Sequence, residues 1–177
     1  IPPDVRPAVY AAYIKNGGAK EIKNLMRHYE SETLHAEKNR ILVALGTATR
    51  VADLRTALRY GLGQRVRSQD TRWPFISAAR TMRGAHVAWE VITEHWDVIN
   101  TRFGKSGHDL PRFVQCASLL ATEEDYAAVQ NFFKTHNATG ATRAVEQTLE
   151  SIRSRILWRK KHAVSVAAWL TEHSSKA

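Results

Sequence analysis

The feature that most constrains the fold of this chain is a stripe of large apolar residues between positions 88 and 103. The members are spaced three and four apart, and they are Trp89, Ile92, Trp96, Ile99 and Phe103. This spacing places side chains on one face of an α-helix, with most of the charged residues of the segment off that face. Two tryptophans seven residues apart stand on almost the same bearing, which requires a wide partner surface. The stripe therefore predicts a helix that packs against other helices.

Similar spacings recur along the chain, interrupted by Gly, Pro and capping residues, and no segment has the alternation of a strand. The pattern predicts about ten helices. The first four cover Pro7 to the Gly17–Gly18 break, Ile22 to Tyr29, residues 34 to 45, and Val51 to Leu62. The fifth begins at Ser68 or Asp70, and the sixth is the tryptophan helix, which is entered through Gly84 and ended by the break at 104–107. The seventh begins at Asp109 and Pro111, the eighth follows Thr122, the ninth runs from about Thr142 to Trp158, and the tenth holds Val164 to Leu170.

These helices form five expected pairs of roughly 35 to 40 residues each, which is close to the pair length of HEAT-type arrays. We therefore expect an all-α fold, an irregular α-solenoid of antiparallel pairs similar to HEAT or ARM superhelices. Such a stack has one concave face, and concave faces of solenoids bind partners.

Length and composition are consistent with a single helical-repeat domain over residues 1–177, because 44% of the residues are hydrophobic. No apolar stretch approaches the roughly 20 residues that span a bilayer. The chain opens at Ile1 without an initiator Met or an apolar signal core, so we expect a C-terminal fragment of a larger polypeptide. Cys116 lies in an apolar helical run and is expected to be a small buried thiol rather than a nucleophile.

The formal net charge of +9 raises the expectation of acidic partners. The basic residues are scattered, however, and only Arg159–His162 forms a short run, near an expected helix end where cations complement the helix dipole. Two interpretations stay open: a solvated helical surface, or a basic α-solenoid that binds nucleic acid or acidic proteins. We expect few aromatic side chains to be free to stack on bases, which disfavours nucleic acid.

Motifs of catalysis are missing from the sequence, including His-Glu-x-x-His, Cys-x-x-Cys and the glycine-rich phosphate loops. His86 and Glu90 could share a helical face as metal ligands, but zinc sites need three or four ligands, and surface pairing is the expected role. The sequon at Asn137 has meaning only in a chain that enters the secretory pathway. The sequence by itself therefore predicts no active site and no metal ligands.

Seven landmarks in order give the chain a family resemblance. They are residues 4–10 (DVRPAVY), 37–40 with 44–46 (EKNR and ALG), 66–70 (VRSQD), 88–90 with 96–97 (AWE and WD), 122–123 leading to 132–133 (TE and FF), 143–152 (RAVEQTLESI), and Trp158 with 169–170 (WL). Together they resemble the C-terminal helical domain of the zinc aminopeptidases of the puromycin-sensitive and aminopeptidase N group. The detail is most similar to fungal cytosolic members, which implies a cytoplasmic protein.

The resemblance implies a non-catalytic part of an enzyme that releases N-terminal amino acids from peptides. In such enzymes zinc is held by an upstream domain, and the helical domain covers the catalytic cavity and contacts the distal part of longer peptides. The implied partners are the missing catalytic domain of the same polypeptide and the peptide substrate, with neither nucleic acid nor a membrane among them. An apolar strip left bare by the missing domain would allow the isolated piece to self-associate.

One substrate-binding residue is carried over from the resemblance. Arg80 lies nine residues before Trp89, where an arginine of the family can face the cavity. A guanidinium there suits a peptide carboxylate or backbone carbonyls, while an arginine in solvent at a helix end is the equally open alternative. Arg72 and Arg83 are poorer candidates, and Met82–Gly84 departs from the family's turn beside Arg80.

Overall fold

The computed structural model describes residues 1–105 and 108–174, so part of the predicted break at 104–107 lies outside the described residues. Within this part of the chain all regular structure is helical, which confirms the all-α prediction. The α-helices are α1 (Arg6–Asn16), α2 (Ala19–Ser31), α3 (His35–Leu45), α4 (Val51–Leu62), α5 (Arg72–Ala78), α6 (Met82–Glu94), α7 (Trp96–Phe103), α8 (Leu110–Gln115), α9 (Glu123–Thr135) and α10 (Thr142–Ser174). Three short 3-10 helices lie at Ser68–Asp70, Cys116–Leu119 and Thr139–Ala141.

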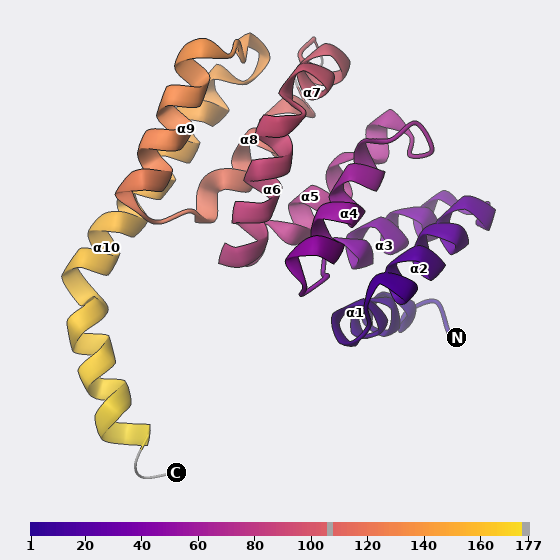
Figure 1. Ribbon diagram of the computed structural model, residues 1–177, viewed down its shortest axis with the longest axis horizontal. Coiled ribbons are helices and arrows are strands. Elements are labelled where there is room, and N and C mark those ends of the chain that lie inside the picture. Colours follow the sequence, from indigo (N-terminus) through magenta and orange to yellow (C-terminus); the bar gives the residue numbers. More distant parts are fainter. Residues whose placement is uncertain (106–107, 175–177) are drawn as a thin grey trace.

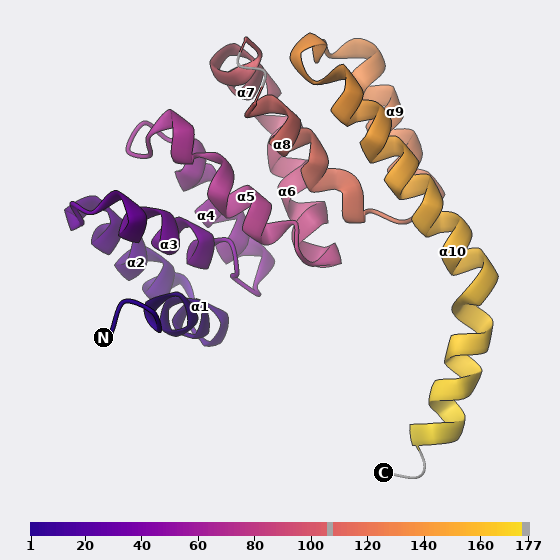
Figure 2. The same ribbon diagram turned by 180° about the vertical axis from the view of Figure 1, so that it is seen from behind.

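The helices stack in two layers. In Figure 1 the layer of α2, α4, α6 and α9 faces the viewer. Figure 2 shows the opposite side, where α3, α5, α8 and α10 lie in front. Helix α1 packs on α3, α3 on α5, α5 on α8 and α8 on α10, while α4 packs on α6 in the other layer. Most of these contacts join helices two places apart along the chain, while α5 and α8 are three places apart, and this is the contact pattern of a stack of helix pairs.

Many side-chain hydrogen bonds connect one helix pair to the next. Arg59 Nη2 donates to Glu94 Oε1 at 2.7 Å, and Arg65 Nη1 donates to Glu30 Oε1 at 2.8 Å, and in both pairs the residues are 35 apart. Others join residues 35 to 40 apart: Arg55 with Glu90, Arg72 with Asp109, Arg102 with the Leu62 carbonyl, and Lys160 with Glu123. The separation matches the predicted pair length, so these bonds repeat with the stack.

The apolar stripe from Trp89 to Phe103 is buried as predicted, but it belongs to two helices. Helix α6 ends at Glu94 and α7 begins at Trp96, with His95 between them at φ −116° and ψ 23°. The Thr93 hydroxyl donates to the carbonyls of Trp89 and Glu90, and such bonds back to the preceding turn bend helices. The prediction of one unbroken tryptophan helix was therefore wrong, although its packing face was right.

The predicted ninth and tenth helices are one helix, α10, which runs from Thr142 to Ser174. No Gly or Pro occurs after Gly140, so nothing in the sequence ends the helix near Trp158. The basic run Arg159–His162 accordingly lies in the middle of α10, and the prediction that it complements a helix terminus was wrong.

The start of the fifth helix also differs from the expectation. Ser68–Asp70 form a 3-10 turn, and α5 begins at Arg72. Asp70 is buried and accepts a hydrogen bond from Arg67 Nε at 2.7 Å, so its carboxylate serves this turn rather than an N-cap.

Two local predictions are confirmed. Thr122 caps α9, because its hydroxyl accepts from Asp125 N at 3.0 Å while the Asp125 carboxylate accepts from Thr122 N at 3.0 Å. Cys116 is buried, and burial raises the pKa of its thiol to about 12. A thiol of this kind stays protonated near neutral pH and does not act as a nucleophile.

Candidate functional site

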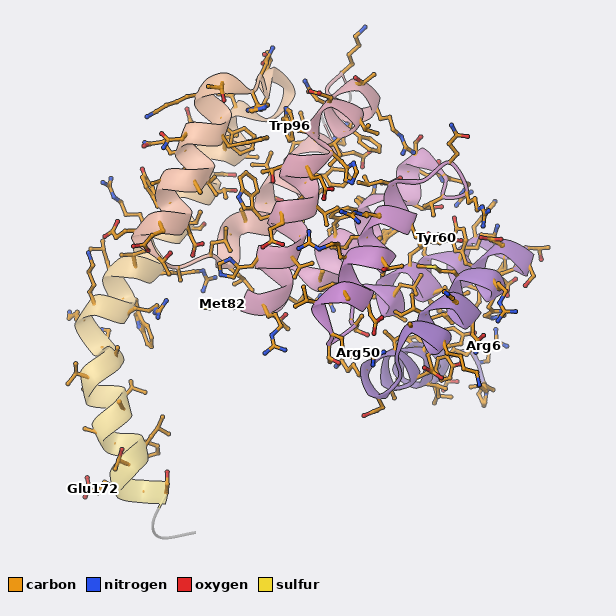
Figure 3. All side chains as sticks on the ribbon, viewed as in Figure 1. Arg6, Arg50, Tyr60, Met82, Trp96 and Glu172 are labelled. Carbon is orange, nitrogen blue, oxygen red and sulfur yellow. The ribbon has the colours of Figure 1, made fainter. Side chains whose placement is uncertain are left out.

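Two surface hollows meet at Met82, the first residue of α6. The α4–α6 hollow has a volume of about 450 Å³ and is lined by Val51, Arg55, Met82, Arg83, His86, Val87 and Glu90. The α6–α10 hollow has a volume of about 500 Å³ and is lined by Met82, Ala121, Ser154, Arg155, Trp158 and Arg159. Figure 3 marks Met82 at the end of α6 that points toward the open side between α10 and the first helices. The two hollows together form the candidate site.

The sharp turn before Met82 brings the hollows together. Thr81 caps α6, and its hydroxyl accepts a hydrogen bond from Gly84 N at 3.0 Å. A Cβ atom at Gly84 would lie 2.0 Å from the carbonyl oxygen of Ala78, so only glycine allows α6 to start so close to the end of α5. The turn at Met82–Gly84 is thus fixed by this close approach.

Arg80 lies in the same turn, two residues before Met82, and its side chain is exposed. Its backbone N donates to Ser77 O at 3.3 Å, which closes the turn after α5. Arg72 forms an ion pair with Asp109 and stacks over Trp73, so its guanidinium is occupied. The sequence-based candidate is therefore a solvent-exposed arginine in the turn before Met82, and it is not among the residues that line either hollow.

Sequence reasoning missed the two arginines that α10 brings to the α6–α10 hollow. Arg155 Nε donates to Ser118 O at 2.9 Å, and Arg159 Nη1 donates to Ala121 O at 3.2 Å. Carbonyl acceptors fix these guanidinium groups without neutralising them. The hollow consequently combines positive charge with the apolar surfaces of Met82 and Trp158, a combination suited to a peptide end that carries a carboxylate. These residues lie within or next to the predicted ninth helix, but their contacts with Ser118, Ala121 and Met82, far away in sequence, could not be read from the sequence.

The α4–α6 hollow has a different electrostatic character. Arg55 is paired with Glu90, and His86 Nδ1 lies 3.6 Å from Asp125 Oδ1. Both members of the proposed metal-ligand pair, His86 and Glu90, therefore have other partners, as expected for surface pairing. Residues 1–105 and 108–174 contain no group of three or more His, Cys, Asp or Glu side chains arranged to hold a metal ion. In the same residues no helix is both long and apolar enough to cross a bilayer.

Many of the basic side chains of this protein pair with its own carboxylates. Among residues 1–105 and 108–174, eight arginines and one lysine form ion pairs with carboxylates: Arg6, Arg40, Arg50, Arg55, Arg59, Arg65, Arg67, Arg72 and Lys160. These pairs leave less charge for a groove that follows phosphates. Trp158 and Trp169 are each 58% exposed, and the expectation that few aromatic side chains are free to stack on bases stays a prediction.

Comparison with known proteins identifies the family of this chain. The family described as ERAP1-like C-terminal domain matches residues 1–154. The chain belongs to this family. The resemblance seen in the seven sequence landmarks is thereby confirmed at the level of the domain, while the cytoplasmic location and the role of Arg80 stay predictions.

Three relatives illustrate the family's range. Aminopeptidase N of Mus musculus is 29% identical over 180 residues, which cover 99% of this chain and 19% of the relative. Aminopeptidase M1-A of Oryza sativa subsp. japonica is 32% identical over 162 residues, 89% of this chain and 18% of the relative. Endoplasmic reticulum aminopeptidase 2 of Bos taurus is 27% identical over 173 residues, 96% of this chain and 18% of the relative. The chain thus spans less than a fifth of the length of these relatives.

Proposed function

We propose that this chain is the non-catalytic C-terminal domain of a zinc aminopeptidase, here called the parent polypeptide, which releases N-terminal amino acids from peptides. The domain covers the catalytic cavity and contacts the distal part of longer peptides. Family membership and the names of the relatives support this assignment. The observation that carries the peptide contact is the pair of hollows at Met82, with the exposed Arg80 beside it.

The zinc of the proposed enzyme belongs to the part of the parent that precedes this chain. The residues described here do not fit a zinc site, since His86 and Glu90 are engaged by Asp125 and Arg55 and no third ligand joins them. Bound zinc would polarise the scissile carbonyl and activate water upstream. The contribution of this domain is to position the remainder of the peptide.

In the proposed contact, charged residues and apolar residues recognise different parts of the peptide. The guanidinium groups of Arg80, Arg155 and Arg159 attract the carboxylate at the distal end of the peptide. Met82 and Trp158 offer apolar contact to the side chain next to it. A peptide long enough to reach from the catalytic centre to this surface gains the interaction, and a short substrate does not.

The test compares a long peptide with a small aminoacyl-arylamide in the full-length parent. Arg80→Ala should raise KM for the long peptide roughly tenfold, which corresponds to about 1.4 kcal/mol, and leave KM for the arylamide unchanged. Amidation of the peptide's carboxyl terminus should have the same effect in the unaltered enzyme. Arg27→Ala, an exposed arginine of α2 whose guanidinium bonds to Asn24, is the matched control. Equal KM values for Arg80→Ala and the unaltered enzyme would refute the proposed contact.

The isolated chain provides a second test. It should not hydrolyse aminoacyl-arylamides, and turnover by a homogeneous preparation that a chelator abolishes would contradict the assignment. The alternative, a basic α-solenoid that binds nucleic acid, predicts instead an affinity for DNA or RNA that falls steeply as the salt concentration rises.

A further inference from the structure

The second half of α10 extends beyond the two layers of helices. In both views of the ribbon no other helix runs beside it (Figures 1 and 2). Ile156 is the last buried residue of α10, and from Leu157 to Ser174 every side chain is exposed except the half-buried His162. Most helical stability in proteins comes from tertiary packing of an amphipathic face. Among the residues that the structure describes, no other helix covers the apolar side chains of the extension.

One face of the extension carries a stripe of aromatic and aliphatic side chains, here called the α10 stripe. Trp158 and Trp169 are 11 residues apart and share nearly the same bearing, because 11 residues make about three turns. The stripe consists of Trp158, His162, Val166, Trp169, Leu170 and His173. The indole of Trp169 stacks on His173 with ring centroids 4.3 Å apart, and Trp158 lies 5.3 Å from His162. Its two large rings are thus held in place by neighbours on the same helix.

The stripe begins at the α6–α10 hollow. Trp158 lines that hollow together with Ser154, Arg155 and Arg159, so the bearing of the stripe is the one that faces Met82. The later residues of the stripe lie on the same face of α10 and extend the wall of this hollow away from the stacked helices. The stripe is therefore continuous with the surface proposed to face the rest of the enzyme.

The comparisons distinguish the extension from the rest of the chain. The ERAP1-like C-terminal domain match ends at residue 154, whereas the alignment with Aminopeptidase N of Mus musculus covers 99% of the chain. The helical extension thus has a counterpart in a polypeptide about five times as long, since the aligned segment is 19% of that relative. Its counterpart occurs together with a large additional body of protein.

We propose that the α10 stripe docks on the part of the parent polypeptide that precedes this chain, an inference that rests on the proposed function. Two tryptophans in one stripe are the kind of residue that dominates protein interfaces. Monomers rarely leave contiguous apolar patches of more than a few hundred Å² exposed, and two half-exposed tryptophans with Val166 and Leu170 reach that order of size.

The charges near the stripe favour this occupant over an anionic lipid surface. Arg155 and Arg159 donate to carbonyls of the body, and Lys160 Nζ bonds to Glu123 Oε1 at 2.6 Å. These cations lie at the body end of the stripe, whereas residues 162–174 contain no Lys or Arg and one carboxylate, Glu172, so the outer part of the stripe has no cation for anionic lipid headgroups. A partner with a complementary apolar surface requires no cation there.

Hydrogen exchange measured on the isolated chain and on the full-length parent tests the proposal. Amides of residues 157–173 should exchange fast in the isolated chain and at least about tenfold more slowly in the parent, because docking suppresses local opening. Trp169→Ser in the parent should remove most of this protection. Val164→Ser is the matched control, since Val164 is 82% exposed and lies on the opposite bearing of α10, and it should keep the protection.

Each result has a distinct meaning. Equal exchange in the two proteins would overturn the docking proposal, and so would protection in the isolated chain that rises with its concentration, which would assign the stripe to a second copy. Chelator-sensitive arylamide hydrolysis by the parent reports on the proposed function alone. An active parent with an unprotected stripe would therefore refute docking without touching the enzymatic assignment.

Discussion

The chain contains two pairs of tryptophans that repeat at helical spacing, and the structure treats them in opposite ways. Trp89 and Trp96 are 8% and 3% exposed and pack against Phe132 and Phe133 of α9, mostly edge to face. Trp158 and Trp169 contact histidines of their own helix and remain 58% exposed. Helical spacing of tryptophans thus indicates an apolar helix face in both pairs. Whether that face is buried depends on whether another helix of the chain packs on it.

The largest expected effect concerns the buried pair. Trp96→Ala should lower the free energy of unfolding by about 3–5 kcal/mol, because it leaves a cavity between α7 and the α9 phenylalanines. Urea denaturation of the isolated chain measures the change. Trp169→Ala, the counterpart in the exposed pair, should change stability by no more than about 0.5 kcal/mol. Similar losses for the two variants would mean that the extension is packed in solution.

A smaller effect is expected at Glu37, a buried carboxylate of α3. Its Oε2 lies 2.8 Å from Arg40 Nη1 and 3.2 Å from Arg6 Nη1. Burial raises the pKa of this carboxyl, but the hydrogen bonds from Arg40, Tyr10 and Arg6 outweigh it, so that the pKa lies below its ordinary value of 4.5. Glu37→Gln should cost about 1–3 kcal/mol at pH 7.

The pH dependence of that loss follows from the direction of the shift. Since the pKa is lower in the folded state, the stabilisation is fully present above the unfolded value and disappears as pH falls through the folded pKa. The difference between Glu37→Gln and the unaltered chain should therefore shrink below about pH 4.5. Unfolding curves at pH 7 and pH 3 measure it, and a constant difference would contradict the role of the ionised carboxylate.

The exposed ion pairs between helix pairs should contribute less. Arg59 and Glu94 are both nearly half exposed, so Arg59→Ala should cost only about 0.2–1 kcal/mol, and less at high salt. Denaturation at low and high ionic strength gives the value. A loss well above this range would show that the bonds that repeat every 35 residues act as one network.

The smallest effect is expected from shortening the chain. Ending it after Lys160 keeps Ile156 and the bonds of Arg155, Arg159 and Lys160, and the described residues that it removes are exposed apart from the half-buried His162. The free energy of unfolding of the shortened chain should stay within about 0.5 kcal/mol of the original. A pronounced loss would place the extension within the cooperative unit of the body.

Sequence patterns within a few residues predicted where helices form, but not where one helix ends and the next begins. The stripe from Trp89 to Phe103 and the cap at Thr122 depend on neighbours within a few residues, so the sequence reveals them. The bend at His95 depends on which carbonyls the Thr93 hydroxyl selects, and no spacing encodes that choice. The basic run after Trp158 resembled a helix end because cations are favoured there, but lysine and arginine are equally good in a helix interior.

The candidate site was harder to predict, because its residues come from distant parts of the chain. Arg80 was predicted from a family position and stays a prediction, since it is exposed two residues before Met82 and lines neither hollow. The walls come from α4, α6 and α10, which are up to about a hundred residues apart, and only the stacking of helix pairs brings them together. Sequence periodicity indicates a concave face without indicating which side chains line it.

The continuity of α10 has a mechanical consequence. The helix is attached to the body as far as Lys160, and the 14 residues from Lys161 to Ser174 form an arm roughly 21 Å long at 1.5 Å per residue. A tilt of about 10° at the point of attachment moves the tip by roughly 4 Å. A small change in how the last pairs stack is thereby amplified into a large displacement at Trp169.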